Sequence, residues 1–279
     1  MFPCGRFYAE PVRWVSTSTD GVAMFTPPQS ATWHHWRVPP WFDTHVHLDR
    51  YAEPERAAVV ERAASANVAI VGIPVDIESS RALAGASGAA GYAVGVHPKH
   101  ALTLDASLGE LARGERVVAI GECGFDSAAP NPELQQRVFR AQCSLARSLK
   151  LPLVLHLDGD TAWSMFSECA EASDGLVVVR HYFTGDAAEA EWHGKRGHYL
   201  SFGNPLRRRS ELRDIARLYP AELLLIETDS YPAPGRNTEP CHVTLVGETL
   251  ALVRDWTFDQ AREQLAENAQ RAFPRLTGR

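Results

Sequence analysis

The chain has 279 residues, of which 45% are hydrophobic and 22% are charged, a composition typical of folded globular proteins that argues against wholesale disorder. The net charge of -6 argues against a protein that coats nucleic acid non-specifically, because such proteins carry a basic excess. The sequence contains no run of about 18 apolar residues, so we expect no membrane helix.

Cysteine usage and the first residues predict a location. The five cysteines are an odd number without a Cys-x-x-Cys pair, which argues against a disulfide framework and against a thiolate zinc site. The N-terminal residues lack the basic start and the continuous apolar run of a signal peptide. We therefore expect a soluble cytoplasmic protein without a membrane partner.

Residues 1–40 differ from the rest of the chain. Pro-Pro pairs at 27–28 and 39–40 interrupt them, and Thr19-Asp20-Gly21 is typical of a hairpin turn. We expect an irregular N-terminal extension or a short hairpin here, followed by one large domain from 41 to 279.

From residue 41 onward, short β-branched runs alternate with longer segments whose apolar residues recur every three or four positions. This alternation is typical of βαβ units around a parallel sheet, and eight strands with eight crossovers predict a (β/α)8 TIM barrel. Two further helices, 239–256 and 257–273, are expected to complete the outer ring, the second capped by Thr257 with Gln260. The predicted strands are residues 41–48, 68–76, 91–98, 117–126, 152–159, 175–185, 197–204 and 222–230.

The first predicted strand contains the sequence WFDTHVHLD. His45 and His47 are two positions apart, so on a strand both imidazoles project from one face and could hold the same ion. Taken alone, the pair is equally compatible with two half-buried structural residues.

The carboxyl ends of other predicted strands carry similar side chains. In a (β/α)8 barrel these ends meet on one face, where the chemistry takes place. Burying four imidazoles and two carboxylates together without a cation would carry a heavy desolvation cost, so the group favours a metal site over separate structural roles. The six candidate ligands are His45, His47, Glu122, His156, His181 and Asp229.

The size of this set predicts two ions. Four ligands saturate a tetrahedral zinc, whereas six divide into two open sets. We expect one ion on His45, His47 and Asp229 and the other on His156 and His181, with Glu122 bridging both. Imidazoles and carboxylates without thiolates suit zinc, manganese, cobalt or nickel, and suit magnesium only where waters complete the shell.

These residues and the phrases around them resemble the TatD-like metal-dependent deoxyribonucleases of the metallo-dependent hydrolase superfamily. The resemblance spans roughly residues 41–273, and the order of the phrases makes it specific. Besides Gln135, Phe139, Asn268 and Phe273, the matching phrases are DTHVHLD (43–49), GVHP (95–98), GECGFD (121–126), LPLVLH (151–156), HYFTG (181–185), GHYLSFG (197–203) and ETDS (227–230).

The resemblance implies a barrel hydrolase that cleaves phosphodiesters of DNA, often from an end or at damaged positions, with the same six ligands. We expect the DNA substrate to be single-stranded or a strand end. It also implies that His97 and Asp126 hold substrate or support the metal ligands. The chain departs from the family in two phrases. Asp158 stands where members usually carry an arginine, which puts the usual phosphate contact there in doubt, and ETDSYP lacks the usual proline directly after the serine.

The expected mechanism follows from the two ions, because coordination lowers the pKa of water from about 15.7 to roughly 7 and provides a hydroxide at neutral pH. This hydroxide would attack phosphorus, with Glu122 and Asp229 as the catalytic carboxylates and Asp229 relaying the proton. Arg207, with Arg208 and Arg209, follows the seventh predicted strand and is a candidate for steering phosphate. A triple arginine is more often a solvated turn.

Two alternatives stay open. One is an amidohydrolase or lactonase that acts on a small molecule; many amidohydrolases bridge their metals with a carbamylated lysine, and none of the three lysines lies late in a predicted strand. The other is a non-catalytic barrel subunit of a larger repair or defence complex. Degenerate enzymes usually lose ligands, and this chain keeps all six, which favours catalysis on DNA.

Overall fold

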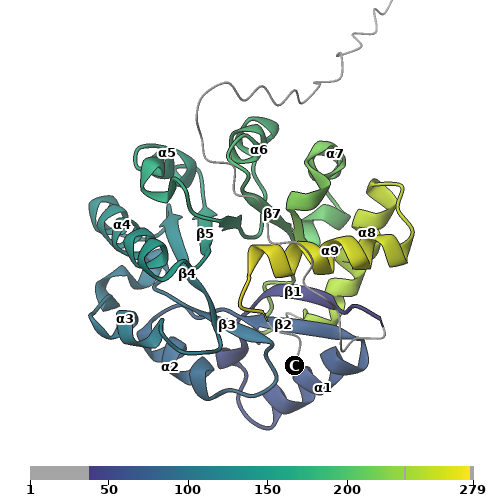
Figure 1. Ribbon diagram of the computed structural model, residues 1–279, viewed down its shortest axis with the longest axis horizontal. Helices are drawn as coiled ribbons and strands as arrows, with labels where there is room; N and C mark the ends of the chain where they lie inside the picture. Colours follow the sequence, from purple (N-terminus) through teal and green to yellow (C-terminus); the bar gives the residue numbers. More distant parts are fainter. Residues whose placement is uncertain (1–37, 236, 277–279) are drawn as a thin grey trace, which may run out of the picture. The chain divides into compact units, whose positions relative to one another are not determined.

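The structure of the chain is a computed structural model that describes residues 38–235 and 237–276. Eight parallel strands form one sheet in chain order (Figure 1). A bridge between Val46 and Ser230 joins the first strand to the segment after the last, which closes the barrel and confirms the predicted TIM-barrel fold. The strands are β1 (Trp41–Val46), β2 (Val68–Gly72), β3 (Gly91–Val94), β4 (Val117–Asp126), β5 (Leu153–Asp158), β6 (Val178–Arg180), β7 (Tyr199–Phe202) and β8 (Leu224–Ile226).

Most strands end earlier than the sequence predicts, and the difference falls where polar residues follow the apolar run. Strand β8 ends at Ile226, and Asp229 beyond it has φ 51°, a left-handed backbone that cannot continue a strand. Some of the polar side chains, such as Asp229, therefore lie on loops at the carboxyl end of the barrel and not on the strands. Strand β4 alone has the predicted length.

Helices connect the strands and surround the barrel. The α-helices are α1 (Glu55–Ser65), α2 (Ile77–Gly85), α3 (Ser107–Leu111), α4 (Pro132–Leu149), α5 (Ala162–Ser167), α6 (Ala187–Gly194), α7 (Ser210–Leu218), α8 (Val243–Val253) and α9 (Phe258–Ala272). Short 3-10 helices are η1 (Leu48–Arg50), η2 (Pro98–Thr103), η3 (Ala170–Ser173), η4 (Asn204–Arg207), η5 (Ala221–Leu223) and η6 (Pro240–His242). In the described residues, none of these helices combines the length and apolar composition needed to cross a bilayer.

Helix α9 differs from the expectation that it completes the outer ring. It begins with the predicted cap, since Gln260 N donates to Thr257 Oγ1, but it crosses the amino-terminal end of the barrel (Figure 1). Asn268 Nδ2 donates to the carbonyl oxygens of Ala221 and Leu224, which lie before and at the start of β8. The helix thus caps the end of the barrel that lies opposite the carboxyl ends of the strands.

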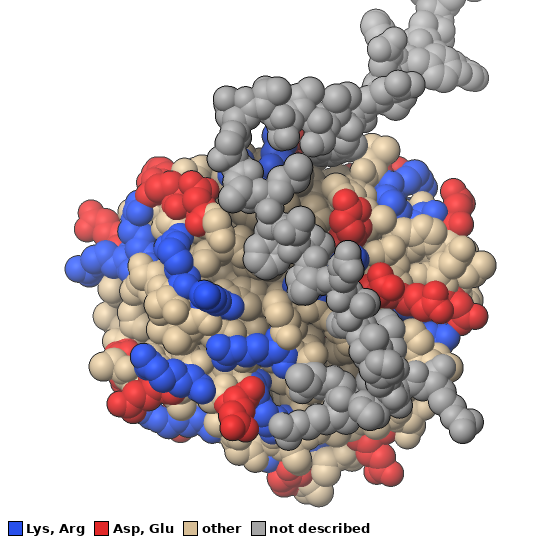
Figure 2. Space-filling model, viewed as in Figure 1, with Lys and Arg blue, Asp and Glu red and all other residues tan. Residues whose placement is uncertain are grey.

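The interior of the barrel and α9 share one buried cluster. Small alanines let α9 approach the strand residues closely, and Phe273 fills the remaining space. The cluster includes Phe42, Val71, Ile73, Ala93, Val118, Val154, Leu225, Ala266, Ala269 and Phe273. On the end of the barrel that α9 crosses, Lys and Arg side chains lie among Asp and Glu side chains (Figure 2).

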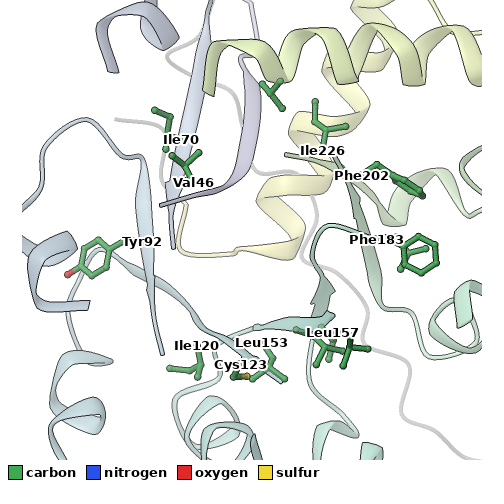
Figure 3. Close-up of a cluster of buried hydrophobic side chains, with 14 of the residues drawn as sticks. Val46, Ile70, Tyr92, Ile120, Cys123, Leu153, Leu157, Phe183, Phe202 and Ile226 are labelled. Atoms are coloured by element: carbon green, nitrogen blue, oxygen red, sulfur yellow. The ribbon is translucent and has the colours of Figure 1, made fainter. Parts of the chain in front are cut away.

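A second, larger cluster fills the space between the strands and the surrounding helices. Figure 3 shows part of it, with Ile70, Ile120, Leu153 and Phe202 among its labelled members. Alternation along each strand places one set of side chains in this cluster and the other set inside the barrel. Residues 1–37 lie outside the described residues, so the predicted extension and the domain boundary stay predictions.

Candidate metal centre

The six predicted ligands converge at the carboxyl end of the barrel. His45 lies on β1 and His47 directly after it, while Glu122 lies in the middle of β4. His156 lies on β5, His181 follows β6, and Asp229 lies three residues after β8. Four of the six are buried, while the side chains of His156 and Asp229 are 14% and 19% exposed, so the cluster opens to solvent beside these two residues.

One set of atoms gathers around Asp229. His47 Nε2 lies 3.2 Å from Asp229 Oδ1, and His45 Nε2 lies 3.9 Å from the same oxygen. Glu122 faces both rings, with its carboxylate oxygens 3.6 Å from His45 Nε2 and 3.6 Å from His47 Nε2.

A second set gathers on the other side of Glu122. Its Oε2 lies 3.3 Å from His156 Nδ1 and 3.1 Å from His181 Nε2, and these two nitrogens are 2.9 Å apart. An ion bound at about 2.1 Å holds its ligand atoms roughly 3.0 to 3.4 Å apart, which matches this set closely. Glu122 lies between the two sets, and His45, Glu122 and His181 together also lie close enough to hold an ion, so the division of the ligands between two ions stays a prediction.

The buried nitrogens of His45 test whether a cation fits. The side chain is fully buried, and neither Nδ1 nor Nε2 has a hydrogen-bond partner. A buried polar atom without a partner is costly, whereas coordination of an ion by Nε2 would satisfy it. The residues present therefore fit a divalent metal, which the donor set of imidazoles and carboxylates also favours.

Two of the other three histidines have hydrogen-bond partners at the ring nitrogen that faces away from the cluster, and the third, His156, faces a carboxylate there without a hydrogen bond. His47 Nδ1 lies 3.0 Å from the carbonyl oxygen of Ile73, and His181 Nδ1 lies 3.2 Å from Glu227 Oε1. His156 Nε2 lies 3.5 Å from Asp126 Oδ2. Such partners fix the tautomer and leave the opposite nitrogen free to bind a metal.

Asp126 belongs to this group of supporting residues. His97, Asp126 and His156 also lie close enough together to hold an ion of their own. His156 cannot serve both sites, however, because a ring that offers Nδ1 beside Glu122 carries its proton on Nε2. We therefore assign Asp126 as the carboxylate that supports His156. Asp126 Oδ1 accepts a hydrogen bond from the backbone N–H of Ala128 at 2.8 Å, and Lys99 Nζ lies 2.7 Å from Oδ2.

Electrostatics favour an ionised carboxylate at the centre. Burial would raise the pKa of Glu122, but the surrounding imidazoles outweigh it and hold this pKa well below its usual range. Burial would lower the pKa of His181, yet the hydrogen bonds to Glu122 and Glu227 outweigh burial and raise it to about 10. A cation bound at His181 Nε2 would displace the proton that this raised pKa favours.

His97 is a neutral donor beside the cluster. Burial lowers its pKa to about 3, so the ring carries no charge at pH 7. Its Nδ1 accepts a hydrogen bond from the backbone N–H of Lys99 at 3.0 Å, so the proton lies on Nε2. The ring contacts His156 edge to face, with centroids 4.2 Å apart.

The description "TatD related DNase" belongs to the family model that matches residues 42–274. The chain belongs to this family. A metal-dependent hydrolase named YabD from Bacillus subtilis, whose printed name calls it uncharacterized, is 33% identical over 83% of this chain and 98% of its own length. The 3'-5' ssDNA/RNA exonuclease TatD of Erwinia amylovora is 34% identical over 78% of this chain and 93% of its own.

A solved structure has the same fold. The TatD homologue YJJV from Escherichia coli superposes with a TM-score of 0.70 and 26% identity, covering 84% of this chain and 98% of that one.

Not every predicted site residue lies in the cluster. His97 and Asp126 contact ligands, whereas Arg207 is an exposed residue at the end of η4, after β7, and its role stays a prediction. Glu227 and Lys99 were missed as site residues. Glu227 stands two positions before Asp229 in ETDS, and Lys99 two positions after His97 in GVHPK, so proximity to a predicted site residue was the available signal.

Proposed function

We propose that this chain hydrolyses phosphodiester bonds of DNA with the help of two divalent metal ions. The observation that carries the proposal is the convergence of six ligands from five strands around His45, a fully buried ring with no hydrogen-bond partner on either nitrogen. Family membership supports the reaction class, because relatives carry the names metal-dependent hydrolase and exonuclease.

When bound, the ions would supply a water of lowered pKa and would offset the negative charge of the phosphate. Glu122 presents Oε1 to His47 and Oε2 to His156 and His181, so one carboxylate would serve both ions. Asp229, at the open side, would accept the proton that the attacking water loses. The neutral Nε2–H of His97 would donate to a non-bridging oxygen of the phosphate, which gains charge in the transition state.

The substrate that we propose is single-stranded DNA or a strand end. The side chains that open the cluster to solvent lie at one end of the barrel, which suits a strand that can bend into a mouth better than a rigid duplex. The metals are zinc, manganese, magnesium or cobalt. A cytoplasmic location and protein partners in a repair or defence complex stay predictions.

The test combines metal analysis with cleavage of end-labelled oligonucleotides. Purified chain should retain divalent metal and should degrade a single strand with manganese, zinc, cobalt or magnesium added. Glu122→Gln should lose metal and lower kcat/KM by more than about a hundredfold, because the shared ligand of both ions is weakened. Labels at the 5' and 3' ends, and a matching RNA, determine polarity and sugar preference.

The same preparations separate the alternatives. Hydrolysis of lactones or cyclic amides without cleavage of oligonucleotides would replace this proposal with a small-molecule hydrolase. A wild-type chain that holds no metal and cleaves nothing with any of the four ions would identify a non-catalytic barrel.

A further inference from the structure

We infer that Lys99 binds a phosphate of the DNA strand next to the one that is cleaved. The inference rests on the proposed function and deepens it, because it names the cation that recognises a polyanionic substrate beside the metal centre.

The position of Lys99 carries the inference. It lies in η2, directly after the loop that holds His97, and its Nζ is 2.7 Å from Asp126 Oδ2. Asp126 in turn contacts His156, a candidate ligand of one ion, at 3.5 Å. The ammonium group is therefore separated from the metal centre by a single carboxylate.

The exposure of Lys99 shows that the ion pair does not use up its hydrogen-bonding capacity. Its side chain is 48% exposed, whereas that of Asp126 is 1% exposed. An ammonium group has three N–H donors, and the contact with Asp126 needs one of them. The remaining donors face solvent at the mouth of the site, where a phosphate can accept them while Asp126 keeps its contact.

Acidic side chains around Lys99 make its positive charge more important for binding a DNA strand. Asp158 is exposed and pairs in register with Asp126, and Asp160 is exposed two residues further along. Both repel phosphate. The charges of Asp158 and Glu122 reach Lys99, because they add to the main effect of the hydrogen bond with Asp126 in raising its pKa.

Two arginine side chains near the carboxyl end of the barrel use their N–H groups for other contacts. Arg180 is buried and its guanidinium contacts Glu189 and two backbone carbonyl oxygens. Arg209 pairs with Glu211 and donates to the carbonyl oxygen of Thr184. Lys99 thus combines an exposed ammonium group with a contact that leads to a metal ligand.

The experiment measures cleavage of a single-stranded oligonucleotide by the metal-loaded wild type and by three variants at several salt concentrations. Lys99→Gln removes the charge and keeps an N–H donor for Asp126, and Lys99→Arg keeps the charge. Lys195→Gln is the matched control, since Lys195 is exposed on α6 and pairs with Glu191.

Lys99→Gln should raise KM about fivefold to tenfold with kcat within twofold, at wild-type metal content. The slope of log KM against log salt should fall by about 0.7, which is the change for one lost phosphate contact on a single strand. Lys99→Arg and Lys195→Gln should behave as the wild type. Replacing the phosphate next to the cleaved position with one neutral methylphosphonate should raise the KM of the wild type and leave the KM of Lys99→Gln unchanged.

Three results would overturn the inference. A wild-type KM and salt slope in Lys99→Gln would show that the strand does not meet this side chain. Loss of activity in step with loss of metal would reduce Lys99 to a partner of Asp126. A wild-type chain that cleaves no oligonucleotide would reject the proposed function itself, and the Lys99 contact with it.

Discussion

The four histidines of the candidate metal centre differ in the partner of the ring nitrogen that faces away from the other candidate ligands. Glu227 is a fully buried carboxylate among these partners, and it accepts from His181 Nδ1 and from the backbone N–H of Tyr182. Burial raises the pKa of Glu227, and the hydrogen bond from His181 counteracts this. The orientation of one ligand therefore depends on a carboxylate that touches no ion.

Glu227→Gln should lower metal affinity by about tenfold or more, because an uncharged acceptor makes the His181 imidazole a weaker ligand. Titration calorimetry with zinc or manganese measures the change. Glu222→Gln is the control, since Glu222 is an exposed residue in η5, just before β8. An unchanged dissociation constant in Glu227→Gln would contradict the role assigned to it.

For single residues, the sequence indicates candidate metal ligands better than it indicates the residues that contact and orient those ligands. His45, His156 and His181 lie on or directly after predicted strands, so a barrel brings them together whatever the conformation of the loops. Glu227 acts through His181 and Lys99 acts through Asp126. Contacts between loops of different βα units determine these partners. Residue type and spacing do not encode such contacts.

Among the elements, β4 has the strictest backbone requirement. Gly124 adopts φ 144°, a conformation that side chains disfavour, and an added Cβ would lie 2.0 Å from the carbonyl oxygen of His156. Strands β4 and β5 carry Glu122 and His156, so this close approach positions the two ligands relative to each other.

Gly124→Ala should destabilise the chain by roughly 1 to 3 kcal/mol and should abolish metal-dependent activity, because β5 must move away from β4. Urea unfolding and metal analysis measure both effects. Gly85→Ala is the control: Gly85 ends α2 with open space around it, so the same substitution should be neutral or slightly stabilising. Equal stability of the two variants would refute the steric argument.

A buried ion pair joins α6 to β6. Arg180 Nε lies 3.0 Å from Glu189 Oε1, and both side chains are buried. Burial would raise the pKa of Glu189, but the nearby His193 ring and the Arg180 charge outweigh it and lower this pKa. The folded state thus binds a proton at Glu189 more weakly than the unfolded chain does.

The depressed pKa fixes the sign of the pH dependence. The Glu189 carboxylate stabilises the fold above its unfolded pKa of about 4.3, and this contribution is lost as the pH falls through the lower folded value. Glu189→Gln should therefore cost about 1 to 3 kcal/mol at pH 7 and progressively less below pH 4 or so. Urea unfolding over this pH range tests it. Glu191→Gln, on the exposed side of α6, should change stability by less than about 0.5 kcal/mol.

For the whole molecule, the metal centre links distant parts of the chain. Its six ligands come from β1, β4, β5 and the segments that follow β1, β6 and β8, so ions bound there would oppose separation of these strands. A ligand that binds only the folded state stabilises it by about 2.7 kcal/mol at a hundred times its dissociation constant.

Chelation should therefore lower the Tm by roughly 5 to 10 °C for a domain of this size, and added zinc or manganese should restore it. Differential scanning fluorimetry measures the shift. Glu122→Gln should show little response to either treatment. If neither chelator nor added metal changes the Tm of the wild type, the six residues do not bind a cation.

The barrel itself is predictable because alternating apolar runs and amphipathic segments leave few other arrangements for a chain of this length. The position of α9 is not, since an amphipathic pattern shows that one face is buried but not which surface buries it. Ala266, Ala269 and Phe273 fit the end of the barrel as well as its side in composition, and only packing against the interior cluster distinguishes the two.

The position of α9 restricts how a polymer can use the site. Within the described residues, the axis is filled by packed side chains below the ligands and closed by α9, so a strand cannot thread through the molecule. Substrate and products must enter and leave through the same opening. Successive cuts on one molecule would then depend on sliding within that opening or on release and recapture, and never on topological enclosure of the strand.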